Sequence, residues 1–206
     1  MARYLVTSVI FLALVMVAGP TWAQSESEFS TAREQLAALE RDRPEAVSEG
    51  SLLSVEHSLN LVERFRSKGG QAANVRRYYD HAHQAIADAR AGRDPLAAKR
   101  GFVTRAYRSE ISTELQPYSI YVPESYDPSR PTPLLVVLHG GSSNHNLFLG
   151  VVFGNNLDWL TYSAHLNDLF LPWFATDWLV VAPNGFGQVM WCWMGEQDVL
   201  DVIDDV

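Results

Sequence analysis

The chain has 206 residues, of which 47% are hydrophobic and 19% are charged, a composition typical of globular proteins and not of disordered ones. Sixteen basic residues against 24 acidic ones give a net charge of −8, which argues against nucleic-acid binding by phosphate neutralisation. A single cysteine, Cys192, excludes an internal disulfide framework and any zinc site built from cysteines.

Residues 1–23 have the layout of a secretory signal peptide. Arg3 supplies a short basic region, residues 4–18 are almost wholly apolar, and Gly-Pro at 19–20 ends that run. Thr-Trp-Ala at 21–23 offers small residues before a cut after position 23. The apolar run is shorter than the roughly 20 residues of a membrane span, so we expect secretion or periplasmic export and no stable span after cleavage. An uncleaved anchor is the alternative.

Helical patterns fill much of residues 24–100, which we expect to form a helical module. The motif Thr-Ala-Arg-Glu at 31–34 fits a capping box and predicts a helix start there. Residues 51–68 place apolar side chains on one stripe, and residues 72–91 do the same. The stripe positions are Val55, Leu59 and Val62 in the first segment, and Val75, Tyr79, Ala82, Ile86 and Ala89 in the second.

Asp80, His81 and His83 invite a metal-site interpretation within the last of these helices. Positions two apart on a helix point about 200° away from each other, so the two histidines cannot chelate one ion. We therefore expect solvated polar side chains here and no metal site.

After Gly101 the pattern changes to strands. Residues 102–108 and 116–122 look like two strands, the second with Tyr118, Ile120 and Val122 on one face. The runs at 134–138 and 178–182 are apolar at every position, as in strands buried on both faces. A helix at about 156–175 would join them into a βαβ unit. The predicted fold class is therefore α/β.

The last twelve residues, 195–206, predict a helix. Val199, Val202, Ile203 and Val206 fall at helical spacing and would form its buried stripe. Glu196 and Asp198 suit the positive end of the helix dipole as capping residues, and cation binding is the alternative. Because this helix stops in the middle of its stripe, we expect the chain to be a fragment of a longer protein.

Tryptophans are dense between residues 159 and 193. We expect most of them to pack in the core, and the alternative is that they line an aromatic substrate cleft. Cys192, between two of them, is expected to be buried and inert. The tryptophans are Trp159, Trp173, Trp178, Trp191 and Trp193.

Four segments of the second half occur in an informative order. They are YVPESYDP at 121–128, residues 134–144 with a His-Gly-Gly turn, VVAPNG at 180–185 and GEQDV at 195–199. Together they resemble the N-terminal half of the catalytic domain of secreted α/β-hydrolases. The group most resembled is the esterases similar to polyhydroxybutyrate depolymerases and feruloyl esterases, with prolyl-oligopeptidase-like peptidases adjacent. The resemblance implies that residues 101–206 are the first half of an α/β-hydrolase sheet.

The same resemblance implies one half of an acyl-transfer site. In this family one oxyanion-hole donor comes from the turn after the strand that ends in His-Gly. On this sequence the donor would be the backbone N–H of Gly141, with Ser142 as the neighbouring candidate. Gly140 would let the backbone turn tightly, and His139 would support the loop and not act as the catalytic base.

A catalytic nucleophile cannot be assigned in this sequence, because no Gly-x-Ser-x-Gly occurs in it. Residues 140–144 come nearest but lack the closing glycine. In the resembled family the nucleophile elbow, the acid and the histidine all follow the last helix predicted here. The resemblance therefore puts the triad beyond Val206, and Ser142 or Ser143 as nucleophile is the alternative.

We therefore expect an exported serine hydrolase that cleaves small or polymeric carboxylic esters through an acyl-enzyme, without a cofactor or a nucleic-acid partner. The present chain would lack the nucleophile and be inactive alone. One alternative is a serine peptidase of the same fold. The other is a non-catalytic exported binding or scaffold protein, whose helical module holds a partner and whose hydrolase-like half is vestigial.

Overall fold

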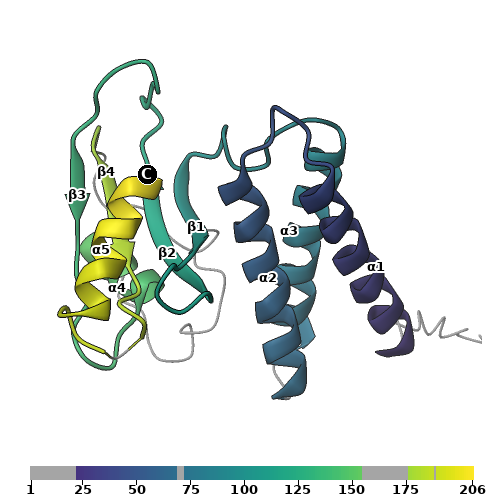
Figure 1. Cartoon of the computed structure of the whole chain (residues 1–206). Coiled ribbons are helices and arrows are strands. Elements are labelled where there is room, and N and C mark those ends of the chain that lie inside the picture. The colour runs from purple at the N-terminus through teal and green to yellow at the C-terminus, as the bar shows by residue number, and fades with distance from the viewer. Residues whose placement is uncertain (1–21, 69–71, 155–175, 188) are drawn as a thin grey trace, which may run out of the picture.

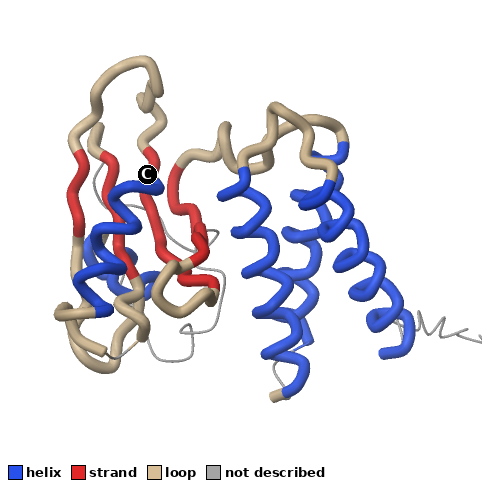
Figure 2. Tube along the Cα trace, in the orientation of Figure 1, coloured by secondary structure: helices blue, strands red, loops and turns tan. Residues whose placement is uncertain are grey.

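The computed structural model describes residues 22–68, 72–154, 176–187 and 189–206. Three helices lie beside a four-stranded sheet with helices on its faces, as Figure 1 and Figure 2 show. Helices together with a mixed sheet make this an α/β structure. Most of the expected signal peptide lies outside the described residues, and its expected cut after Ala23 falls in the first turn of the first helix. Within the described ranges, no helix combines the length and the apolar character that crossing a membrane needs.

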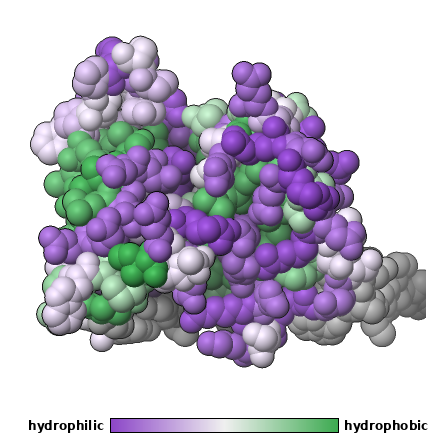
Figure 3. Space-filling model, in the orientation of Figure 1, coloured by the Kyte–Doolittle hydropathy of each residue, from purple (hydrophilic) through white to green (hydrophobic). Residues whose placement is uncertain are grey.

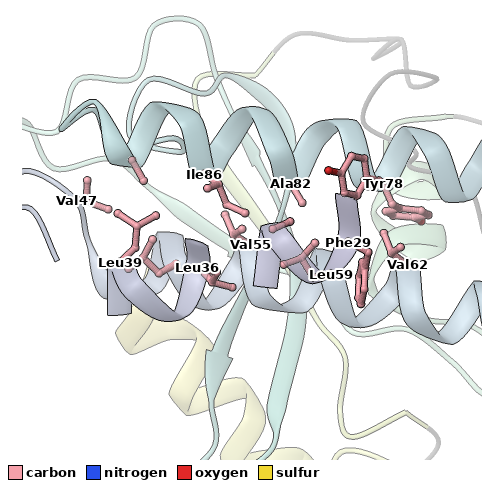
Figure 4. Close-up of a cluster of buried hydrophobic side chains, with 14 residues drawn as sticks. Phe29, Leu36, Leu39, Val47, Val55, Leu59, Val62, Tyr78, Ala82 and Ile86 are labelled. Atoms are coloured by element: carbon pink, nitrogen blue, oxygen red, sulfur yellow. The ribbon is translucent and has the colours of Figure 1, made fainter. Parts of the chain in front are cut away.

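The helical module consists of α1 (Trp22–Arg41), α2 (Glu49–Ser67) and α3 (Ala72–Arg90), which share one apolar core. Figure 4 shows side chains of the three helices meeting between them. The predicted stripe of α2 is confirmed, and so is that of α3, in which only Val75 is partly exposed. The buried core consists of Phe29, Ala32, Leu36, Leu39, Val47, Leu52, Val55, Leu59, Val62, Tyr78, Tyr79, Ala82, Ile86 and Ala89.

The predicted helix start at Thr31 is wrong, because α1 already begins at Trp22. The hydroxyl of Thr31 donates to the carbonyl oxygen of Ser27, at 2.9 Å, inside the helix. A serine or threonine followed by a glutamate can thus occur within a helix, where the hydroxyl bonds back one turn instead of capping.

The other helix ends follow local signals. Ser48 caps α2 by accepting a hydrogen bond from the amide of Ser51 at 3.2 Å. At the end of α3, Gly92 takes a left-handed conformation with φ of 73°, and the amide of Arg93 donates to the carbonyl oxygen of Asp88 at 2.9 Å. This arrangement satisfies carbonyl groups that the helix end would leave without partners.

The sheet has the strand order β1-β2-β4-β3. The strands are β1 (Gly101–Arg108), β2 (Leu115–Val122), β3 (Leu134–Val136) and β4 (Leu179–Pro183). β2 pairs antiparallel with both β1 and β4, whereas β3 pairs parallel with β4. The predicted parallel pairing of the two apolar runs is confirmed, and the described part of the sheet is mixed.

A helix covers each face of the sheet. On one face α4 (His145–Val152) packs through Leu149 against β2 and β4, and on the other α5 (Met194–Asp205) packs through Val202. Alternation along the strands divides their side chains between the two cores. The first core holds Phe102, Tyr121, Leu149, Phe153, Val180 and Ala182, and the second holds Val103, Tyr107, Tyr118, Ile120, Leu179, Val181 and Val202.

The prediction that residues 134–138 form a strand buried on both faces is wrong. β3 is three residues long, and Leu135 is 39% exposed. The reason is its position: among the described residues β3 pairs only with β4, and α4 packs over β2 and β4 instead. Figure 3 shows hydrophobic surface gathered at this end of the molecule, whereas the visible face of the helical module is mostly hydrophilic.

The helix that joins β3 to β4 was expected at about 156–175, and those residues lie largely outside the described ranges. The structure instead shows α4 directly after the Gly-rich turn. The side chain of Asn144 caps α4 by accepting from the amide of Leu147 at 2.9 Å. Asn144 before an apolar run is the sequence signal for this helix.

The predicted stripe of α5 is partly wrong. Val202 is fully buried, but Ile203 is 41% exposed. The inner face of α5 includes the buried Asp198 and also Asp205, whose carboxylate accepts from the Tyr118 hydroxyl at 2.6 Å. Polar contacts to the sheet therefore set the rotation of this helix, which apolar spacing alone did not predict.

Candidate active site

Two loops meet where the parallel strands β3 and β4 end. Residues 139–144 follow β3, and residues 184–193 follow β4. In open α/β sheets a ligand crevice lies beyond the carboxyl ends of the strands. His139, Gly140 and Gly141 from the first loop line one pocket of about 160 Å³ with Gly185, Gly187, Met190 and Trp191 from the second.

His139 joins the two loops and is buried. Its Nδ1 lies 2.9 Å from the carbonyl oxygen of Gly140, and its Nε2 lies 3.1 Å from the carbonyl oxygen of Asn184. A neutral imidazole can donate to only one of these acceptors at a time. Because both ring nitrogens face backbone carbonyl oxygens, His139 holds the loops and presents no free nitrogen to the pocket.

Trp191 forms the opposite wall of the pocket. Its indole Nε1 donates to the carbonyl oxygen of His139 at 2.9 Å, and its ring meets the imidazole edge to face at 5.0 Å between centroids. A methyl group on Gly185 would lie 2.7 Å from the Trp191 ring. A glycine is therefore required at position 185, both for this contact and because its φ is 56°.

Gly141 is exposed and lines the pocket. Across the ranges that the structure describes, no residue accepts a hydrogen bond from its backbone amide. The tight turn is made by Ser142, whose φ is 62°, and not by Gly140, whose φ lies outside the left-handed region. A serine in this conformation is uncommon, and such residues cluster at functional sites.

Asp198 was expected to cap the last helix, and the structure gives it another role. The side chain is fully buried. Its carboxylate accepts from the backbone amide of Gly185 and from the hydroxyl of Tyr107, both at 2.6 Å. Asp198 therefore ties the pocket wall to β1, whereas Glu196 is exposed in the first turn of α5.

Burial raises the pKa of Asp198, and the hydrogen bonds from Tyr107 and Gly185 offset only part of this effect. Burial, followed by the hydrogen bond to Asp198, raises the pKa of Tyr107. The sequence signal for this residue is an acid four positions before the buried Val202, on the inner face of an amphipathic helix.

Large apolar side chains on both sides of β4 in the sequence are exposed. Cys192 is exposed, so the prediction that it is buried is wrong. Trp193 is 84% exposed and Trp178 is 50% exposed, so the expectation of core packing is wrong for both. Trp159 and Trp173 lie outside the described residues. Of the described tryptophans after residue 150, Trp191 is the one that lines the pocket.

A serine–histidine contact lies outside the pocket. The hydroxyl of Ser119 lies 2.9 Å from Nδ1 of His145 and also donates to the side-chain oxygen of Asn146. Since its proton goes to Asn146, Ser119 accepts from His145 and is not activated as a nucleophile. Both residues are buried, and burial lowers the pKa of His145 to about 3.

The metal and nucleophile candidates of the sequence lie in α3 and in the loop after β3. No group of three His, Cys, Asp or Glu side chains there gathers closely enough to hold a metal ion. In α3, Asp80 pairs with Arg76 at 2.9 Å and His83 stacks on Tyr79. Ser142 is exposed and Ser143 is half-buried in the loop that follows β3.

Comparison with known proteins gives little further information. Neither a scan against protein-family models nor a search of curated proteins found a match. A solved structure titled "Crystal Structure of a Thermostable Esterase" is 18% identical over 51% of this chain, with a TM-score of 0.32. The chain spans 30% of the length of that structure. A TM-score this low establishes neither a common fold nor a common activity.

Proposed function

We propose that this chain provides the oxyanion-loop side and one cleft wall of an exported serine hydrolase that cleaves carboxylic esters through an acyl-enzyme. The supporting observation is Gly141, which lines a pocket beyond β3 and whose backbone amide has no acceptor among the described residues. Attack on an ester puts negative charge on the carbonyl oxygen, and preorganised N–H donors stabilise that charge.

The roles of the other residues follow from this proposal. Gly141, with Ser142 beside it, donates to the carbonyl oxygen of the substrate. His139 supports the loop and is not the catalytic base, because both of its ring nitrogens already face backbone carbonyl oxygens. The nucleophile, the base and the acid belong to residues that follow Val206. The pocket of about 160 Å³ is smaller than most complete ligand sites, and it receives the reacting carbonyl and not the whole substrate.

The product of the complete reading frame tests this proposal. It should be assayed with p-nitrophenyl esters of short and long acids and, in parallel, with peptide p-nitroanilides. We expect turnover of the esters and a downstream Gly-x-Ser-x-Gly whose serine is required for it. Turnover of the peptide p-nitroanilides alone would show a peptidase activity in place of the proposed esterase activity. No turnover of either substrate class would contradict the proposal.

A further inference from the structure

The outer edge of β1 faces the helical module. β1 is an edge strand of the described sheet, and α2 packs against it, as Figure 1 shows. In an antiparallel pair, alternate backbone amides of an edge strand point away from the partner strand and need another acceptor. An edge without such acceptors is a template for pairing with another chain.

A side chain of α2 satisfies one of these outward amides. The hydroxyl oxygen of Ser54 accepts from the backbone amide of Ala106 at 3.0 Å and donates to the carbonyl oxygen of Gly50 at 2.7 Å. Both Ser54 and Ala106 are buried. Because its proton is already directed at Gly50, the hydroxyl presents a lone pair to the strand. The helix thus supplies the acceptor that another strand would otherwise provide.

Pro117 fits the same arrangement from the opposite strand. The register pairs Ala106 with Pro117. Since the Ala106 amide points to α2, this is a non-hydrogen-bonded pair, and the nitrogen of Pro117 faces away from β1. On that side the last residue of β4, Pro183, pairs with Tyr118. No described residue of β4 therefore lies opposite Pro117 and needs a hydrogen bond from its nitrogen. Proline therefore costs the sheet no ladder hydrogen bond.

Two further contacts fasten the helix beside the strand. The guanidinium of Arg108 in β1 lies 2.9 Å from the carboxylate of Glu56 in α2. Asp94, in the segment that joins α3 to β1, accepts from the amide of Ser48 at 2.8 Å and from the hydroxyl of Ser51 at 2.7 Å. Both the edge strand and the segment leading to it are therefore bonded to α2.

We propose that the surface of α2 around Ser54 is a docking surface for the β1 edge of the same chain, and that the helical module is an intramolecular edge cap. This role differs from that of a module that holds a separate partner protein, because the sheet of the chain itself occupies the surface. It follows that the module and the sheet unfold together, and that loss of the Ser54 hydroxyl opens the edge at Ala106.

Hydrogen exchange at single amides, measured by NMR on the full chain, tests the contact. Ser54→Ala should speed exchange of the Ala106 amide at least about tenfold relative to Ser58→Ala. Ser58 is the matched control, because its hydroxyl donates to the carbonyl oxygen of Ser54 at 3.0 Å on the same helix. The Tyr107 amide, which points toward β2, should not change. Exchange at Ala106 within about twofold of the control would overturn the proposal.

Unfolding of the otherwise unmodified chain tests the consequence even if Ser54→Ala fails to fold. In a Trp22→Phe background every remaining tryptophan follows residue 150, so fluorescence reports on the sheet half. Far-ultraviolet circular dichroism reports mainly on α1, α2 and α3, the longest described helices. We expect the two urea transitions to coincide. Two separate transitions would show an independent module and overturn the edge-cap proposal, without bearing on ester hydrolysis.

Discussion

The indole Nε1 of Trp191 donates a hydrogen bond to the carbonyl oxygen of His139 at 2.9 Å, so the loop after β4 is tied directly to the loop after β3. In the opposite direction, Nε2 of His139 lies 3.1 Å from the carbonyl oxygen of Asn184. Each loop therefore contributes a side chain to the backbone of the other. These two contacts define the separation of the pocket walls.

Removing the indole donor should loosen this connection. Trp191→Phe keeps an aromatic ring beside Gly185 but loses the hydrogen bond to His139, so we expect the free energy of unfolding to fall by about 1–2 kcal/mol. Trp193→Phe is the control, because its side chain is 84% exposed, and it should change stability by less than about 0.5 kcal/mol. Urea unfolding measures both. Equal effects of the two substitutions would contradict the role given to Trp191.

Gly185 should be the least replaceable glycine of the pocket. A Cβ there would meet the Trp191 ring at 2.7 Å, whereas a Cβ on Gly187 would meet nothing within 4 Å. Both glycines have positive φ, so alanine is strained at both, by roughly 1 kcal/mol. We expect Gly185→Ala to cost about 1–3 kcal/mol more than Gly187→Ala, because the ring must move. Comparable unfolding midpoints for the two variants would count against the described packing.

The buried carboxyl of Asp198 gives a prediction for pH dependence. Its folded-state pKa is raised above the ordinary value of 3.8, chiefly by burial. The contribution of this group to stability is therefore complete below pH 3.8 and declines as pH rises through the raised pKa. Asp198→Asn removes this dependence and leaves Tyr107 or Gly185 without an acceptor, at a cost of about 1–3 kcal/mol at neutral pH.

Urea unfolding of the unmodified chain and of Asp198→Asn across a pH series checks the direction of this pH dependence. The stability advantage of the unmodified chain should be largest below pH 3.8 and smaller at neutral pH. Asp204→Asn, which changes an exposed carboxyl of the same helix, is the control. An advantage that grew with rising pH would mean that Asp198 is stabilised as a carboxylate and would contradict the prediction.

The buried His145 should give stability the opposite dependence on pH. Burial, followed by the nearby His57 and His139, lowers its pKa to about 3 from 6.5. The stability that this neutral imidazole contributes is complete above pH 6.5 and is lost as pH falls toward 3, by up to about 4 kcal/mol. The stability advantage of the unmodified chain over His145→Asn should therefore narrow on acidification. A difference in stability between the two chains that did not change with pH would contradict this prediction. His83→Gln, at an exposed position, is the control.

Periodicity predicted the parts of the fold in which one face of an element is apolar. The stripes of α2 and α3, the parallel pair β3 and β4, and the strands β1 and β2 were all found from spacing alone. The order of the strands could not be predicted in this way, because an apolar run does not encode how many neighbouring strands a strand has. For that reason residues 134–138 were expected inside the sheet although β3 lies at an edge of its described part.

For the candidate site, too, the sequence predicted the local features and not the contacts between distant segments. The His-Gly-Gly turn and its place after a strand came from the sequence and from the family resemblance. The residues that hold the turn and the facing loop were not predicted. Trp191 donates to His139 from 52 positions away, and Asp198 accepts from Gly185 across 13 positions, and such contacts leave no local pattern. The left-handed conformation of Ser142 was missed because glycine, its neighbour, is the residue usually assigned that role.

The central claim concerns the backbone N–H of Gly141, and a pair of substitutions isolates it. Gly141→Ala keeps the N–H, and its Cβ would meet nothing within 4 Å, whereas Gly141→Pro removes the N–H. In the product of the complete reading frame, we expect Gly141→Pro to lower kcat/KM for a p-nitrophenyl ester by about 10²–10³-fold relative to Gly141→Ala. Equal kcat/KM values in two equally folded variants would contradict the account.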